Sequence, residues 1–125
     1  MEELKRTIIA LASPAREQIK LYPEFVCIGD ELVLDFDEAY KEIKEPVFNP
    51  EQKGALEELD QFLESHAGPE FEEMYLERDS LFKDMRWVKI RNLAHRVIEA
   101  MGWNYENPVG PDAVYLGKKN KNIRE

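Results

Sequence analysis

The chain has 125 residues, 43% of them hydrophobic and 34% charged, and a formal net charge of -9 at pH 7. These values are typical of one folded domain with its own core, and they exclude a chain that is disordered throughout. No stretch approaches the roughly 18 consecutive apolar residues of a membrane span, and the acidic start is unlike a signal peptide, so we expect a cytoplasmic protein. The single cysteine, Cys27, excludes an internal disulfide and a cysteine-rich zinc site.

The first quarter of the sequence predicts two short helices and an extended segment. Residues 2–11 place leucine and isoleucine side chains on one face of a helix. Ser13 and Pro14 are typical of a helix start, and the helix that follows ends before Pro23. Residues 24–28 are rich in Phe, Val and Ile, and this composition favours a strand.

The stretch from Asp30 to Glu45 predicts a helix with two faces. Asp30 is its expected N-cap, and Pro46 stops it. Its apolar residues recur at i, i+4, i+7 and i+11, which is the spacing of a buried stripe. Five carboxylates recur at the same spacing, one residue out of phase, and form a ridge beside that stripe: Glu31, Asp35, Glu38, Glu42 and Glu45. We call these five residues the acidic ridge.

Three further helices are expected in the second half of the chain. Asn49 begins a capping box for a helix over residues 50–66, and a shorter helix follows over residues 69–77. The longest helix is predicted over residues 81–101, with Phe82 on its buried face. The sequence therefore predicts an all-α bundle of five or six helices.

The C-terminal part of the sequence has no helical pattern. Ala113–Leu116 favours a short strand, which would form a minor two-stranded β patch if it paired with residues 25–28. We expect one domain over residues 1–117, followed by a basic, mobile tail over residues 118–125.

Charge is distributed unevenly along the chain. Residues 24–80 carry 18 acidic and 4 basic side chains. Such a segment repels nucleic acid and anionic membranes, and it attracts a basic protein. The sequence therefore predicts a non-catalytic domain that binds a basic protein partner through the acidic ridge. The alternative is that the acidic faces only keep the protein in solution.

Basic and aromatic side chains are concentrated in the predicted helix over residues 81–101. A helical projection spreads them around the axis, whereas a nucleic-acid recognition helix would gather them on one face. We therefore expect ion pairs with the acidic helices, and no nucleic-acid binding. The side chains in question are Lys83, Arg86, Trp87, Lys89, Arg91, His95 and Arg96.

Two carboxylate pairs with i, i+3 spacing lie on successive predicted helices: Asp35 with Glu38, and Glu57 with Asp60. The arrangement is similar to the ExxE…ExxD pattern of all-helical nucleoside triphosphate pyrophosphatases of the MazG and dUTPase-like type. That resemblance implies Mg²⁺ held by these four residues and hydrolysis of a nucleoside triphosphate. Magnesium-dependent hydrolysis is thus the alternative function, and Glu42-x-x-Glu45 can replace the first pair.

In size, acidity and lack of a catalytic motif, the chain resembles bacterial immunity proteins and antitoxins that neutralise nuclease toxins. Its first third, from Ala12-Ser13-Pro14-Ala15 to Asp30-Glu31-Leu32, also resembles a small bacterial protein family. The resemblance of type implies an inhibitor of a basic, nuclease-type partner. A third hypothesis is homo-oligomerisation, with the basic tail of one subunit, Lys118–Arg124, on the acidic ridge of another.

Overall fold

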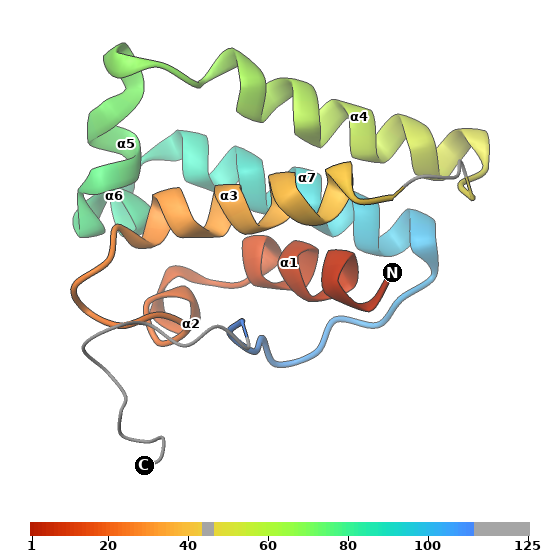
Figure 1. Ribbon diagram of the computed structural model, residues 1–125, viewed down its shortest axis with the longest axis horizontal. Helices are drawn as coiled ribbons and strands as arrows, with labels where there is room; N and C mark the ends of the chain where they lie inside the picture. Colours follow the sequence, from red (N-terminus) through yellow and green to blue (C-terminus); the bar gives the residue numbers. More distant parts are fainter. Residues whose placement is uncertain (44–46, 112–125) are drawn as a thin grey trace.

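The structure, a computed structural model, describes residues 1–43 and 47–111, and these residues form helices with no strand (Figure 1). The all-α class predicted from the sequence is confirmed. No helix within these two stretches has the length and apolar character that a membrane crossing requires. The elements are α1 (Glu2–Ala12), α2 (Ala15–Gln18), α3 (Ile28–Lys41), α4 (Pro50–Ser65), the 3₁₀ turn η1 (Pro69–Phe71), α5 (Glu72–Leu76), α6 (Arg78–Lys83) and α7 (Met85–Met101).

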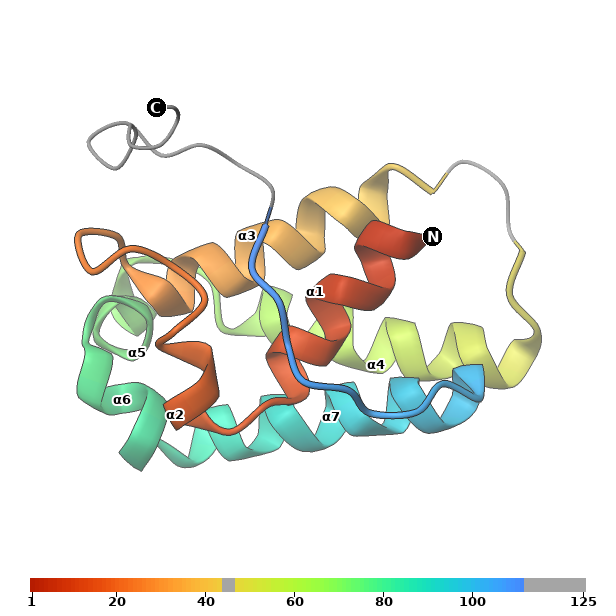
Figure 2. The ribbon, with the colours of Figure 1, turned by 90° about the horizontal axis from the view of Figure 1, so that it is seen from below.

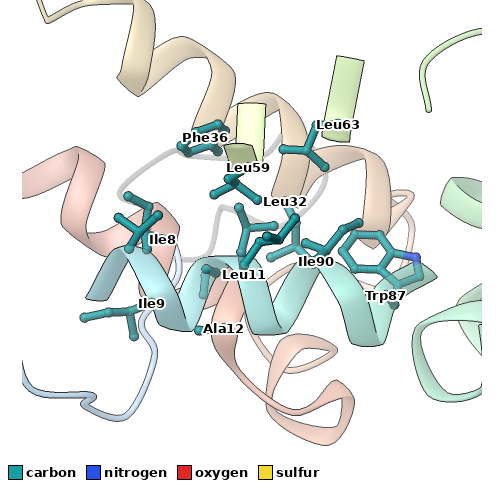
Figure 3. Close-up of a cluster of buried hydrophobic side chains, with 14 of the residues drawn as sticks. Ile8, Ile9, Leu11, Ala12, Leu32, Phe36, Leu59, Leu63, Trp87 and Ile90 are labelled. Atoms are coloured by element: carbon teal, nitrogen blue, oxygen red, sulfur yellow. The ribbon is translucent and has the colours of Figure 1, made fainter. Parts of the chain in front are cut away.

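The longest helices surround one apolar core. Both α1 and α4 pack on α7, and α3 packs on α1, while α5 and α6 close one end of the molecule (Figures 1 and 2). Burial of each large side chain contributes about 1.5–3 kcal/mol, so this cluster is the main source of stability. Its members come from all four long helices and include Ile8, Leu11, Leu32, Phe36, Leu59, Leu63 and Ile90 (Figure 3).

The helix α3 begins two residues before the expected N-cap, at Ile28, and ends at Lys41. Gly29 lies in its first turn and is buried against α5. A Cβ at Gly29 would come within 2.9 Å of the Tyr75 carbonyl oxygen and 3.0 Å of the Trp87 ring. Glycine is therefore required there by the close approach of α3 and α5.

The strand predicted over residues 24–28 is wrong. Residues 24–26 form a turn, in which the Val26 amide donates to the Pro23 carbonyl at 3.3 Å, and Ile28 already belongs to α3. The β patch is consequently not seen. Its expected second strand, at residues 113–116, lies outside the described residues, as does the predicted tail.

The single helix predicted over residues 81–101 is two helices, α6 and α7. Asp84 separates them with an extended ψ of 124°, and its carboxylate accepts a hydrogen bond from the Arg86 amide at 2.9 Å. The apolar spacing of the sequence continues through Asp84, but this residue caps α7 and so ends one helix and begins the next. Phe82 consequently belongs to α6 and is 52% exposed, not buried. Such breaks explain why the described residues contain seven α-helices, where five or six were predicted.

Candidate functional site

The predicted acidic ridge does not present one uniform row of carboxylates. Glu38 and Glu42 are exposed, and neither side chain makes a hydrogen bond or ion pair within the described residues. Glu31 is partly buried, and the side chain of Asp35 is only 18% exposed. Glu45 lies outside the described residues. Of the ridge residues that the structure describes, only Glu38 and Glu42 are therefore placed as a partner-binding surface requires.

Asp35 is an internal link between α3 and the N-terminal part of the chain. The Tyr22 hydroxyl donates a hydrogen bond to its Oδ2 atom, and Arg6 Nη2 lies 3.4 Å from the same atom. Arg6 also forms an ion pair with Glu3 at 2.7 Å and donates to the Val109 carbonyl at 3.2 Å. A carboxylate engaged in this way serves the fold, so we do not retain Asp35 as a binding residue.

A cluster of three carboxylates lies between α3 and α4, and we call Asp37, Asp60 and Glu64 the carboxylate cluster. Burial raises the pKa of Asp60 above its ordinary value, and the charges of Glu64 and Asp37 raise it further. Lys41 acts in the opposite direction and forms an ion pair with Asp37 at 2.8 Å. One lysine beside three carboxylates leaves this surface negatively charged.

The structure does not bring the four predicted magnesium ligands together. Asp35 faces Tyr22 and Arg6, whereas Asp60 has Asp37 and Glu64 as its charged neighbours. Within residues 1–43 and 47–111, no three His, Cys, Asp or Glu side chains are grouped so that they could hold a metal ion. The arrangement therefore gives the magnesium-dependent hydrolase no geometric support.

A hollow of about 450 Å³ opens beside the carboxylate cluster, between α3, the end of α4 and α5. We call this hollow the acidic cleft, because Asp30 and Glu72 are the only charged residues among its described lining residues. Leu34 and Leu76 are each 45% exposed, and together they give the cleft apolar walls that are open to solvent. Its lining residues are Asp30, Val33, Leu34, Leu63, Ala67, Gly68, Pro69, Glu72, Tyr75 and Leu76.

Local contacts fix the shape of the acidic cleft. The Tyr75 hydroxyl donates to the His66 carbonyl at 2.7 Å and so holds α5 against the end of α4. Burial raises the pKa of Tyr75, the Asp30 charge adds to this effect, and Arg86 opposes it. Gly68 turns the chain with a φ of 123°, in the region that favours glycine.

The acidic cleft and the carboxylate cluster share one face of α3. Asp30, Leu34, Asp37 and Lys41 recur at i, i+4, i+7 and i+11, so they lie in one row along the helix. Glu38, next to Asp37, borders the same row. The cleft, the cluster and the exposed Glu38 therefore form one continuous acidic surface with an apolar hollow at one end.

The acidic cleft was not predicted, because the apolar residues of α3 were considered only as parts of its buried stripe. Leu34 lies outside that stripe, and an apolar residue on the polar face of a helix was the one available signal. The expected pairing of basic side chains is confirmed for Arg96, which lies 3.3 Å from Glu58 on α4. It is not confirmed for Arg91, which has no carboxylate within 4.0 Å in the part of the chain that the structure describes.

Comparison with protein-family models, with curated proteins and with solved structures finds no match for this chain. A functional assignment therefore rests on the geometry and charge of the surfaces described above.

Proposed function

We propose that this protein is a non-catalytic domain that binds a basic protein partner through the acidic cleft and the adjoining carboxylate cluster. The observation that carries the proposal is the composition of the cleft, where exposed leucines lie between carboxylates and the residues described in its lining include no basic one. Protein interfaces commonly combine an apolar anchor with a polar rim, and this surface offers both.

The chemistry of the cleft favours a segment that carries lysine or arginine beside apolar residues. The apolar stem of such a side chain would pack on Leu34 and Leu76, while its charged end would meet Asp30 or Glu72. Binding there would also relieve repulsion in the carboxylate cluster, where burial and then the charges of Glu64 and Asp37 raise the pKa of Asp60. Charge complementarity of this kind speeds association and selects the partner.

The narrower proposal is an immunity-like or antitoxin-like inhibitor of a nuclease. A nuclease binds the phosphate backbone with basic side chains, so an acidic domain can occupy the same surface. The net charge of -9 and the continuous acidic surface over α3, α4 and α5 support this proposal. The size and acidity that the chain shares with immunity proteins point in the same direction.

The test is capture of a basic partner from a lysate at low salt, followed by identification and a measured binding constant. The cleft variant combines Glu72→Lys, in the cleft lining, with Glu38→Lys, on the acidic surface that adjoins it. The control combines Glu2→Lys with Glu99→Lys, and all four glutamates are exposed. Both pairs change the net charge equally. We expect the cleft variant to lose at least about 1.4 kcal/mol of binding, a factor of ten, while the control changes by less than half of that.

A third variant, Leu34→Ser, tests the apolar part of the surface. Its loss of affinity should persist at high salt, because salt screens charges and not apolar contacts. Equal binding by the cleft variant and the control would contradict the proposal, since net charge alone would then explain the capture.

A further inference from the structure

A second hollow, of about 620 Å³, lies between the end of α1, α2, α6 and α7. Figure 2 shows α2 beside α6 and α7, at the side of the molecule along which the chain runs after α7. Within the part of the chain that the structure describes, its charged and ionisable lining groups are Arg16, Arg91, His95 and the phenol of Tyr105, with no carboxylate among them. We call it the cationic groove. Its lining residues are Ala12, Pro14, Ala15, Arg16, Leu81, Phe82, Val88, Arg91, Asn92, His95 and Tyr105.

The absence of carboxylates from the described lining is unexpected in a chain with 26 acidic and 17 basic residues. On α7, Val88, Arg91 and His95 recur at i, i+3 and i+7, so one side of the helix lines the groove while another side faces the core. Phe82 is 52% exposed and Val88 is 39% exposed, which gives the groove an apolar wall open to solvent.

Arg91 is the basic group held most firmly in the groove. Its Nε donates to the Ser13 carbonyl at 3.0 Å, and its Nη2 donates to the Gln18 side-chain oxygen at 2.9 Å and to the Leu81 carbonyl. All three acceptors are neutral. Burial lowers the pKa of Arg91 below its ordinary value.

The Arg91 guanidinium is therefore held in one orientation, and part of its donor capacity is unused within the described residues. Three hydrogen bonds fix its plane, while its Nη1 atom makes no hydrogen bond within residues 1–43 and 47–111. The unused Nη1 N–H groups can donate to an oxygen of a ligand carboxylate, and the fixed positive charge of the guanidinium attracts it. Arg16, which is exposed, adds a second positive charge to the same groove.

We propose that the cationic groove binds a small organic carboxylate with an apolar body. The carboxylate would meet Arg91 and Arg16, and the body would lie on Phe82 and Val88. The volume of about 620 Å³ falls within the usual range for small-ligand sites. A purely structural role accounts for the hydrogen bonds of Arg91, but not for an open hollow whose described lining combines apolar and basic side chains without a carboxylate.

The two histidines of the chain allow a direct test by proton NMR. His95 lines the groove, whereas His66 follows α4, where its Nδ1 lies 2.8 Å from the Phe62 carbonyl oxygen. The probe is 4-phenylbutyrate, and the matched probes are neutral 4-phenylbutanol and inorganic phosphate. We expect 4-phenylbutyrate to shift the His95 ring resonance in a saturable manner and to leave His66 unchanged.

Variants then separate the groove from general charge effects. Arg16→Ala should weaken binding about two- to fivefold, as expected for one exposed ion pair. Val88→Asp should weaken it at least about tenfold, because it adds a like charge and removes the apolar wall. Lys89→Ala is the control, since Lys89 is an exposed cation on the same helix and does not line the groove.

Saturable binding of 4-phenylbutyrate that is lost in Val88→Asp and retained in Lys89→Ala would support the proposal. It would be overturned if His95 did not respond, or if 4-phenylbutanol or inorganic phosphate bound as tightly as 4-phenylbutyrate. It would also be overturned if Lys89→Ala weakened binding as much as Arg16→Ala. Each variant is first checked for native unfolding behaviour, so that loss of binding is not loss of fold.

Discussion

The two hollows differ in the sign of their charge and in how that charge is held. In the acidic cleft, Asp30 and Glu72 are exposed and make no hydrogen bond through their side chains within the described residues. In the cationic groove, Arg91 is partly buried and hydrogen-bonded to α2, to α6 and to Ser13, the residue that follows α1. Carboxylates at the cleft can thus be changed without harm to the fold, whereas Arg91 serves the fold as well as the groove.

We expect Trp87→Ala to cause the largest loss of folding stability, and this loss affects both hollows. Trp87 is fully buried, and its Nε1 donates to the Met74 carbonyl at 2.9 Å, so it joins α7 to α5 behind the cleft. We expect a loss of about 3–5 kcal/mol in the free energy of unfolding, measured with urea. The control is Met85→Ala, since Met85 is 73% exposed and should change stability by less than about 0.5 kcal/mol.

Removal of the Arg91 charge tests whether the charges of the two hollows contribute differently to folding stability. Arg91→Met leaves the Ser13 and Leu81 carbonyls without a donor, and we expect a loss of about 2–3 kcal/mol. Glu72→Gln in the acidic cleft should change the same unfolding free energy by less than about 0.5 kcal/mol. Equal losses in the two variants would mean that the two charges are held alike.

Two glycines test how closely α3 approaches α5. Gly29→Ala places a Cβ 2.9 Å from the Tyr75 carbonyl oxygen, and we expect a loss of about 1–2 kcal/mol. Gly54 in α4 has nothing within 4 Å of such a Cβ, so Gly54→Ala should instead stabilise by about 0.5–1 kcal/mol. Urea unfolding distinguishes these opposite signs, and stabilisation by both substitutions would contradict the close approach.

The smallest effect concerns the carboxylate cluster. The pKa of Asp60 is raised in the folded protein, so its ionised form opposes folding above its ordinary pKa of 3.8. Asp60→Asn should therefore stabilise the protein at pH 7 by a few tenths of a kcal/mol, roughly the scale of exposed pairs. The advantage should shrink as the pH falls and Asp60 takes up its proton, and an advantage that grew instead would contradict the assignment.

Local patterns predicted the elements that local chemistry determines. The capping box of α4 forms as expected, because the Asn49 side chain accepts from the Gln52 amide at 2.8 Å and the Asn49 amide donates back at 3.0 Å. The buried stripe of α3, including Leu32 and Phe36, is confirmed as well. Periodicity and capping act over a few residues, so a single sequence reveals them.

The missed features depend on contacts between distant segments. The early start of α3 follows from the packing of Gly29 on Tyr75, and the bond from Tyr22 engages Asp35 within the fold. Arg91 was treated as one surface cation among several, although it binds oxygens of α2, of α6 and of Ser13 between α1 and α2. Neither hollow could be predicted, because their walls meet only after the helices pack.

The most direct test of the account is one amide NMR titration with two ligands of opposite charge. A short peptide of alternating lysine and leucine should shift the amides of Leu34, Gly68 and Leu76 in the acidic cleft, whereas 4-phenylbutyrate should shift those of Leu81, Asn92 and His95 in the cationic groove. Separate responses are the predicted result. A common set of shifted amides, or no saturable response to either ligand, would contradict the claim that two hollows of opposite charge select different ligands.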